Sequence, residues 1–251
     1  MSSRAVHVEH IWGTVVSIDI RLHRSSSTKT DRAIEEVVNW LHDVDEVFST
    51  YKEQSAVSRF RRGELAPDDL DMGMHDVIKR CARIKEITDG SFDPWAVTGG
   101  FDPSGLVKGW ATDRAANILI GNGFKDFLIN AGGDITVRGN PDPNELWSIG
   151  LQHPNLPGQL YTHVKVTDCA IATSGSYERG AHIINPSGGK VVTSSATVIG
   201  PDCATADGLA TALLVAGPAG FEWFEKLPGW SAQIVEDQTV TSLGEVFNSS
   251  V

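Results

Sequence analysis

This sequence of 251 residues lacks the features that mark secreted, membrane-spanning and disulfide-rich proteins. Its three cysteines, Cys81, Cys169 and Cys203, form no C-x-x-C pair, which argues against a disulfide framework or a zinc site. No run approaches the roughly 20 apolar residues of a transmembrane helix. Residues 1–13 contain no continuous apolar signal segment. We therefore expect a cytoplasmic protein with reduced thiols and no membrane insertion.

Basic residues are also scarce, with 21 Lys and Arg against 32 Asp and Glu, which gives a formal net charge of -11. Without a basic stripe, the chain has no means of binding a nucleic-acid backbone by counterion release. Nucleic acid is therefore not an expected partner. A small phosphate ligand is still compatible with this charge, because it needs only one local site of backbone N–H groups, a lysine or a metal.

The apolar periodicity predicts helices in the first half of the chain and strands in the second. Helices are expected at 27–51, 55–63, 74–90, 110–123, 202–217 and 220–227. Strands are expected at 12–22, at 127–140 around a Gly-Gly break, and within 146–200 and 230–247. The segment 91–109 is rich in Gly and Pro and is predicted to be a loop. The absence of βαβ alternation favours an α+β fold, with a mixed or mostly antiparallel sheet, in a single domain over residues 1–251.

The stretch DCATADGLATALLVAG (202–217) is an apolar helix with polar residues near its start. Asp207 and Thr211 are four residues apart and so lie on one helical face. A carboxylate and a hydroxyl placed in this way are suitable ligands for Mg²⁺ or Ca²⁺. Alternatively, Asp207 is favoured by the helix dipole while Thr211 bonds back to a carbonyl, and this simpler reading is the stronger one for the stretch alone. We expect Thr205 to cap the helix.

Two glycine-containing segments are candidates for ligand contact. Lys108 stands between Gly105 and Gly109 just before a predicted helix, where it reaches an anionic ligand or, alternatively, is exposed in a flexible loop. The pair Gly132 and Gly133 separates two predicted strands and admits a flat ligand, although a plain turn or bulge is the more ordinary explanation.

His182 precedes an apolar pair and a proline turn. A lone histidine in this position is more often structural than catalytic. Beside a diphosphate it acts as a general acid or base, because the pKa of imidazole lies near the operating pH. A serine-hydrolase mechanism lacks support, since the sequence contains no G-x-S-x-G motif.

Eight short segments occur in an order that resembles the ApbE family of flavin transferases, and together they span nearly the whole chain. They are WGT (12–14), FSTYKEQSAVSRF (48–60), TDGSFDPWA (88–96), GLVKGWATDRAA (105–116), LINAGGDI (128–135), ATSGSYER (172–179), HIINPSGG (182–189) and TADGLATALLVAG (205–217). Each segment is weak by itself, but their shared order makes the resemblance strong.

The resemblance implies Mg²⁺-dependent transfer of FMN from FAD to a threonine or serine hydroxyl of an acceptor protein, with release of AMP. It implies metal ligands at Asp207, Thr211 and the carbonyl of Gly105, and a motif histidine at His182 as the candidate for proton transfer. It also implies flavin contacts at Trp12, Tyr51, Asp102, Lys108, Gly132, Gly133 and Asp134.

This chain departs from the usual family pattern in several ways. Trp12 stands where members usually carry a methionine that contacts flavin, so its indole either stacks on a ring or blocks the pocket. Pro94 and Asp102 are separated by seven residues, WAVTGGF, instead of the usual several tens, and the usual export signal is missing. The same metal site would also serve an FAD diphosphatase that yields FMN and AMP. A non-catalytic FAD-binding protein is the third reading, and the metal-ligand pair argues against it.

Overall fold

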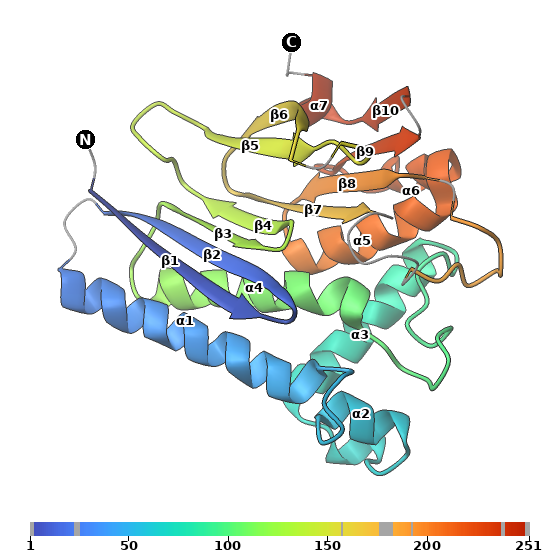
Figure 1. Cartoon of the computed structure of the whole chain (residues 1–251). Helices are drawn as coiled ribbons and strands as arrows, with labels where there is room; N and C mark the ends of the chain where they lie inside the picture. The colour runs from blue at the N-terminus through green and yellow to red at the C-terminus, as the bar shows by residue number, and fades with distance from the viewer. Residues whose placement is uncertain are drawn as a thin grey trace.

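An antiparallel sheet of eight strands forms the centre of the structure, with the order β1-β2-β3-β4-β7-β8-β9-β10 (Figure 1). The computed structural model describes residues 3–22, 26–156, 158–175, 183–191, 193–236 and 239–248. Within them the strands are β1 (Ser3–Ile11), β2 (Thr14–Leu22), β3 (Phe127–Ala131), β4 (Asp134–Arg138), β5 (Trp147–Gln152), β6 (Leu160–Val166), β7 (Cys169–Gly175), β8 (Ser195–Gly200), β9 (Ser231–Glu236) and β10 (Thr239–Leu243). Strands β5 and β6 pair with each other as a separate hairpin.

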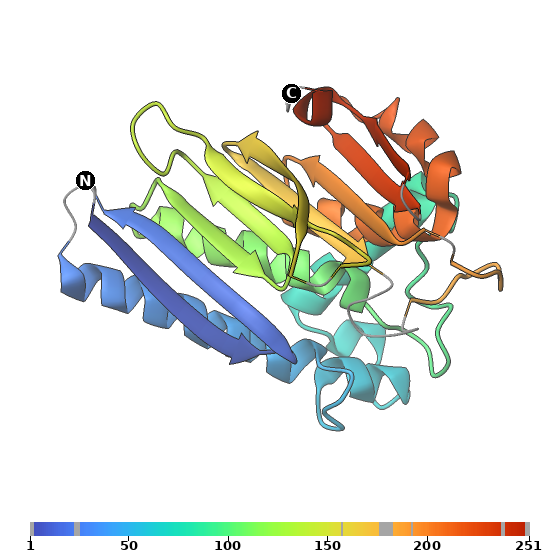
Figure 2. The same cartoon turned by 45° about the horizontal axis from the view of Figure 1, so that its top comes forward.

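The helices pack mostly on one face of this sheet, while the short last helix packs beside the β5–β6 hairpin on the other face. They are α1 (Ser27–Phe48), α2 (Ala56–Arg61), α3 (Met72–Ile87), α4 (Ser104–Gly121), α5 (Cys203–Ala216), α6 (Phe221–Phe224) and α7 (Glu245–Asn248), with 3₁₀ turns at Pro67–Asp69 and Gly217–Gly220. Helices α1, α4 and α5 run beneath the strands in Figure 1, while the β5–β6 hairpin lies over the opposite face, as Figure 2 also shows. The fold is therefore α+β, as the sequence predicts.

Strand alternation divides the core between the two faces. On β4 and β7, Ile135, Val137 and Ile171 point toward the β5–β6 hairpin and pack with Trp147 and Val164. The neighbouring residues of the same strands point toward the helices, because successive side chains of a strand lie on opposite faces. The helix side is filled mainly by α1, α3, α4 and α5.

Three sequence predictions need correction. Strand β1 was not expected, and the strand expected from residue 12 begins at Thr14, because Trp12 and Gly13 form the turn between β1 and β2 with φ values of 57° and 68°. Helix α4 begins at Ser104 and not at 110, so the predicted loop is shorter. The cap of α5 is Asp202, whose side chain accepts the N–H of Thr205, so the prediction that Thr205 caps the helix is wrong.

No helix in the described part of the chain is long and apolar enough to span a membrane. The three cysteines are free thiols. Burial raises the pKa of Cys169 to about 12 and raises the pKa of Cys203 well above its ordinary value. Since the thiolate is the nucleophilic form, neither residue is suited to act as a nucleophile near neutral pH.

Candidate active site

A cleft with a volume of about 820 Å³ opens where the β3–β4 turn, the start of β2 and the end of β7 meet the first turns of α4. Antiparallel pairing places these strand ends at one end of the sheet. The cleft is lined by eight of the predicted site residues, namely Tyr51, Asp102, Gly105, Lys108, Gly132, Gly133, Asp207 and Thr211. The structure therefore gathers residues that lie far apart in the sequence into one cavity.

Asp207 and Thr211 project from α5 into this cleft. Asp207 is only 2% exposed, and its Oδ2 accepts the backbone N–H of Gly109 at 3.1 Å. The hydroxyl of Thr211 lies 3.2 Å from the Ser174 hydroxyl of β7. Because Asp202 caps the helix, Asp207 is not needed as a cap, and its carboxylate is directed at α4 instead.

The first turns of α4 approach α5 very closely. Gly105 has non-helical dihedral angles, with φ -83° and ψ 16°, which kink the helix at this residue. A Cβ atom at Gly105 would lie 3.0 Å from the Thr211 hydroxyl oxygen. One helical turn further on, the N–H of Gly109 donates to the Asp207 carboxylate. Gly105 thus lies against Thr211 and Gly109 against Asp207, the two side chains that the sequence predicts as metal ligands.

Lys108 supplies the positive charge of the cleft. Its ammonium forms an ion pair with Asp134 and lies 3.8 Å from Asp207 Oδ2. Asp134 is 1% exposed, begins β4 directly after the Gly-Gly turn, and is not among the residues that line the cleft. The structure therefore places Asp134 behind Lys108, where it holds the ammonium group in position.

The glycine pair forms the tight turn between β3 and β4. Gly132 and Gly133 have φ values of 60° and 100°, the positive values of a type I′ hairpin turn. The N–H of Gly133 donates to the Asn130 side chain at 2.9 Å, and Gly132 lies against Thr14 of β2. The ordinary explanation of a turn is thus correct, and the turn also lines the cleft.

Three further predicted residues border the cleft in different ways. Asp102 accepts the N–H of Ser104 at 3.0 Å and so shapes the start of α4. Tyr51 is 90% exposed at the mouth. Trp12 lines an adjoining cavity of about 530 Å³, which is also lined by Tyr51 and Lys108. The indole of Trp12 therefore lies beside the main cleft and is not among the side chains that line it.

The sequence analysis missed the far wall of the cleft. This wall comes from the β5–β6 hairpin, through Gly150, Leu151 and Leu160. Periodicity predicts such strands but not where their hairpin packs, so no local signal identifies them. Ser174 was included only as part of the segment ATSGSYER (172–179), and its contact with Thr211 depends on the packing of β7 against α5. His182 lies outside the described residues.

The oxygen donors at the cleft fit a hard divalent cation. Within the described residues, no group of three or more His, Cys, Asp or Glu side chains is placed to hold a metal ion. The candidate set is instead one carboxylate, one hydroxyl and one backbone carbonyl, from Asp207, Thr211 and Gly105. Mg²⁺ is commonly bound by one or two carboxylates together with substrate phosphates, so this small set is sufficient in the presence of a diphosphate.

Comparisons with known proteins point to one family. A profile of the ApbE family matches residues 12–98 and 96–234. The chain is 26% identical over 254 residues to the FAD:protein FMN transferase of Vibrio cholerae, covering 77% of this chain and 74% of that protein. It is likewise 26% identical over 268 residues to the enzyme of the same name from Salmonella typhimurium, covering 81% and 75%.

Solved structures agree with these sequence relatives in fold. The flavin transferase ApbE from Vibrio cholerae superposes with a TM-score of 0.84 at 21% identity, over 100% of both chains. The ApbE protein from Thermotoga maritima gives a TM-score of 0.85 at 23% identity, over 99% of both chains. With the family profile matching most of its length, this chain belongs to the ApbE family.

Proposed function

We propose that this protein is an FAD:protein FMN transferase that works with Mg²⁺. It binds FAD in the 820 Å³ cleft and passes the FMN group to a threonine or serine hydroxyl of an acceptor protein. The acceptor oxygen bonds to the FMN phosphorus, the phosphoanhydride bond breaks, AMP leaves, and the hydroxyl proton is lost. The observation that carries the proposal is the meeting of Lys108 with Asp207, Thr211 and Gly105 at one wall of a large cleft, in a chain of this family.

The residues of the chain have separable roles in this reaction. Asp207, Thr211 and the Gly105 carbonyl would hold the cation, whose chemistry is to neutralise charge on the phosphate oxygens. Lys108 is placed to contact the diphosphate, and Asp134 fixes its ammonium. The Gly132–Gly133 turn allows a flat ring to approach the backbone. His182 stays a prediction for the proton transfer, and a cytoplasmic location also stays a prediction.

Replacement of Asp207 tests the metal site. The change Asp207→Asn keeps an oxygen that accepts the Gly109 N–H but removes the charge that a cation requires. We expect Mg²⁺-dependent FAD turnover to fall at least about 100-fold, because a loss of several kcal/mol of charge stabilisation corresponds to two or more orders of magnitude. The melting temperature should stay close to that of the wild type.

Thr205→Ala in the same helix is the matched control, since the Thr205 side chain does not line the cleft. It should retain wild-type turnover. Unchanged turnover in Asp207→Asn would remove Asp207 from the metal site.

A further inference from the structure

Helices α4 and α5 pack antiparallel along two facing stripes with four-residue steps. On α4 the stripe is Gly105, Gly109 and Asp113, and on α5 it is Thr211, Asp207 and Cys203, in matching order. A Cβ atom on Gly105 would touch Thr211, and one on Gly109 would overlap the Cys203 carbonyl and lie 2.9 Å from Asp207 Cβ. The pairs Gly105–Thr211 and Gly109–Asp207 contain the candidate metal ligands. The third pair, Asp113–Cys203, lies outside the cleft.

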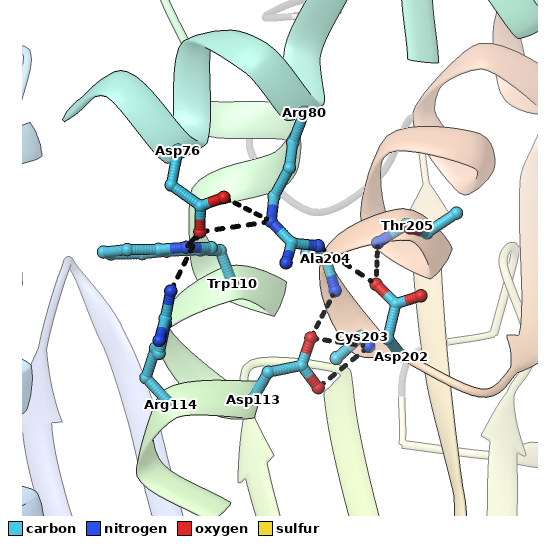
Figure 3. A network of polar contacts seen from close by, with 9 residues as sticks. All are labelled: Asp76, Arg80, Trp110, Asp113, Arg114, Asp202, Cys203, Ala204 and Thr205. Carbon is cyan, nitrogen blue, oxygen red and sulfur yellow. Dashed lines mark hydrogen bonds and ion pairs between the residues drawn. The ribbon is translucent and has the colours of Figure 1, made fainter. Parts of the chain in front are cut away.

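Asp113 closes the third pair with three hydrogen bonds. Its two carboxylate oxygens each accept the N–H of Cys203 at 3.0 Å, and Oδ2 also accepts the N–H of Ala204 at 3.0 Å (Figure 3). The side chain of the cap residue Asp202 accepts the next amide along the helix, that of Thr205. The first two amides of α5 are therefore bound by a residue of α4, and this contact fixes one helix relative to the other.

A second carboxylate braces the same helices from α3. Asp76 accepts the indole N–H of Trp110 at 2.8 Å and an N–H of Arg114 at 3.0 Å, both from α4. Arg80, one turn after Asp76 on α3, pairs with it and lies 3.7 Å from Asp202 (Figure 3). The direct bond between α4 and the start of α5, however, is made by Asp113.

We propose that Asp113 is a positioning residue that sets the register of α5 against α4. It does not line the cleft, so it acts through Gly109 and Asp207. In this register Thr211 faces the Gly105 backbone and Asp207 faces the Lys108 ammonium. The expected effect of Asp113 on the binding of metal and FAD rests on the proposed function, whereas its effect on the helix register does not.

Amide hydrogen exchange at Gly109 tests the register without any ligand. In Asp113→Ala, the first two amides of α5 lose their bonds to α4, so we expect the Gly109 amide, which donates to Asp207, to exchange at least tenfold faster. Asp202→Ala is the matched control, because it removes the cap of the same helix and leaves the Asp113 bonds in place. It should change Gly109 exchange by less than twofold.

Asp113→Asn keeps one acceptor oxygen and should give an intermediate rate of Gly109 exchange. This variant tests the role of Asp113 in the helix register if Asp113→Ala does not fold. For the consequence at the site, titration with Mn²⁺ in the presence of FAD should show at least tenfold weaker metal binding in Asp113→Ala than in Asp202→Ala. The proposal is overturned if Gly109 exchange is unchanged in the Asp113 variants, or if Asp202→Ala accelerates it equally. Because the exchange is measured without FAD or metal, its result is independent of the proposed function.

Discussion

At the scale of single residues, the cleft depends on how one lysine and two aspartates are arranged. Lys108 lies between Asp134 and Asp207, both of which are almost fully buried. Buried carboxylates are costly unless they are paired, so each requires a nearby cation or hydrogen-bond donors. Asp134 has Lys108, while Asp207 has the Gly109 amide as well as Lys108 at a greater distance. The two carboxylates thus share one ammonium group, and in the proposed function a bound cation would add positive charge beside Asp207.

Lys108→Ala should weaken FAD binding. A charge-assisted hydrogen bond contributes about 1.5–3 kcal/mol, which corresponds to a roughly 10- to 100-fold higher Kd, measured by the quenching of flavin fluorescence. The melting temperature should also fall, because Asp134 loses its ion-pair partner. Lys79→Ala, on the exposed side of α3, is the control and should leave the Kd unchanged. An unaltered Kd in the Lys108 variant would count against its role at the phosphates.

Asp113 should make the stability of the protein depend on pH. Burial raises the pKa of its carboxyl to about 6, against the opposing effects of the Ala204 and Cys203 amides and of Arg138, and with a further increase from Asp202. The folded state therefore keeps this proton to a higher pH than the unfolded chain. This difference in pKa stabilises the folded state by about 3 kcal/mol below about pH 4. The stabilisation is lost as the pH rises to about 6.

Asp113→Asn does not titrate, so it separates this contribution from those of the other carboxyl groups. Urea unfolding of both proteins at pH 4 and pH 7 should show the wild type losing about 3 kcal/mol relative to the variant across this range. Parallel pH profiles for the two proteins would show that Asp113 has an ordinary pKa.

At the scale of elements, the pairing of α4 with α5 requires glycine at the crossing point. A side chain at Gly109 has no room, since its Cβ would overlap the Cys203 carbonyl. Gly109→Ala should therefore cost about 1–3 kcal/mol, as overpacked cores usually do, and should lower FAD turnover by moving Asp207 away from the first turns of α4.

Gly121→Ala, at the end of the same helix, is the matched control because its Cβ would meet nothing within 4 Å. It should be neutral or slightly stabilising, since alanine has the higher helix propensity. Thermal unfolding of the two variants measures the difference. Equal melting temperatures would contradict the close approach of the two helices.

The elements also show which local signals predict structure. The apolar periodicity of α1 and α3 predicts both helices to within a few residues. It fails for β1, where Val6 and Val8 are exposed while His7 and Glu9 face inward, and Glu9 bonds to His42 of α1. It fails at the start of α4 because the sequence Ser-Gly-Leu-Val-Lys-Gly resembles a loop, although Gly105 and Gly109 are required there by the approach of α5.

At the scale of the whole molecule, the order of helices and strands was enough to predict the α+β class but not the location of the cleft walls. The motif residues were predicted as a set, and the cleft brings most of them together. Two features of the site could not be predicted from local sequence patterns. The β5–β6 hairpin closes the far wall through packing on the sheet, and Asp113 bonds to amides 90 and 91 positions further along the chain. Both depend on tertiary register, which no short motif encodes.

The most direct test of the central proposal is the intact mass of candidate acceptor proteins that expose threonine or serine hydroxyls, after incubation with this protein, FAD and Mg²⁺. We predict that an acceptor gains the mass of FMN less one water, that AMP appears in equal amount, and that Asp207→Asn produces neither. Release of free FMN and AMP, with no mass gain on any acceptor, would contradict the account and identify the protein as an FAD diphosphatase.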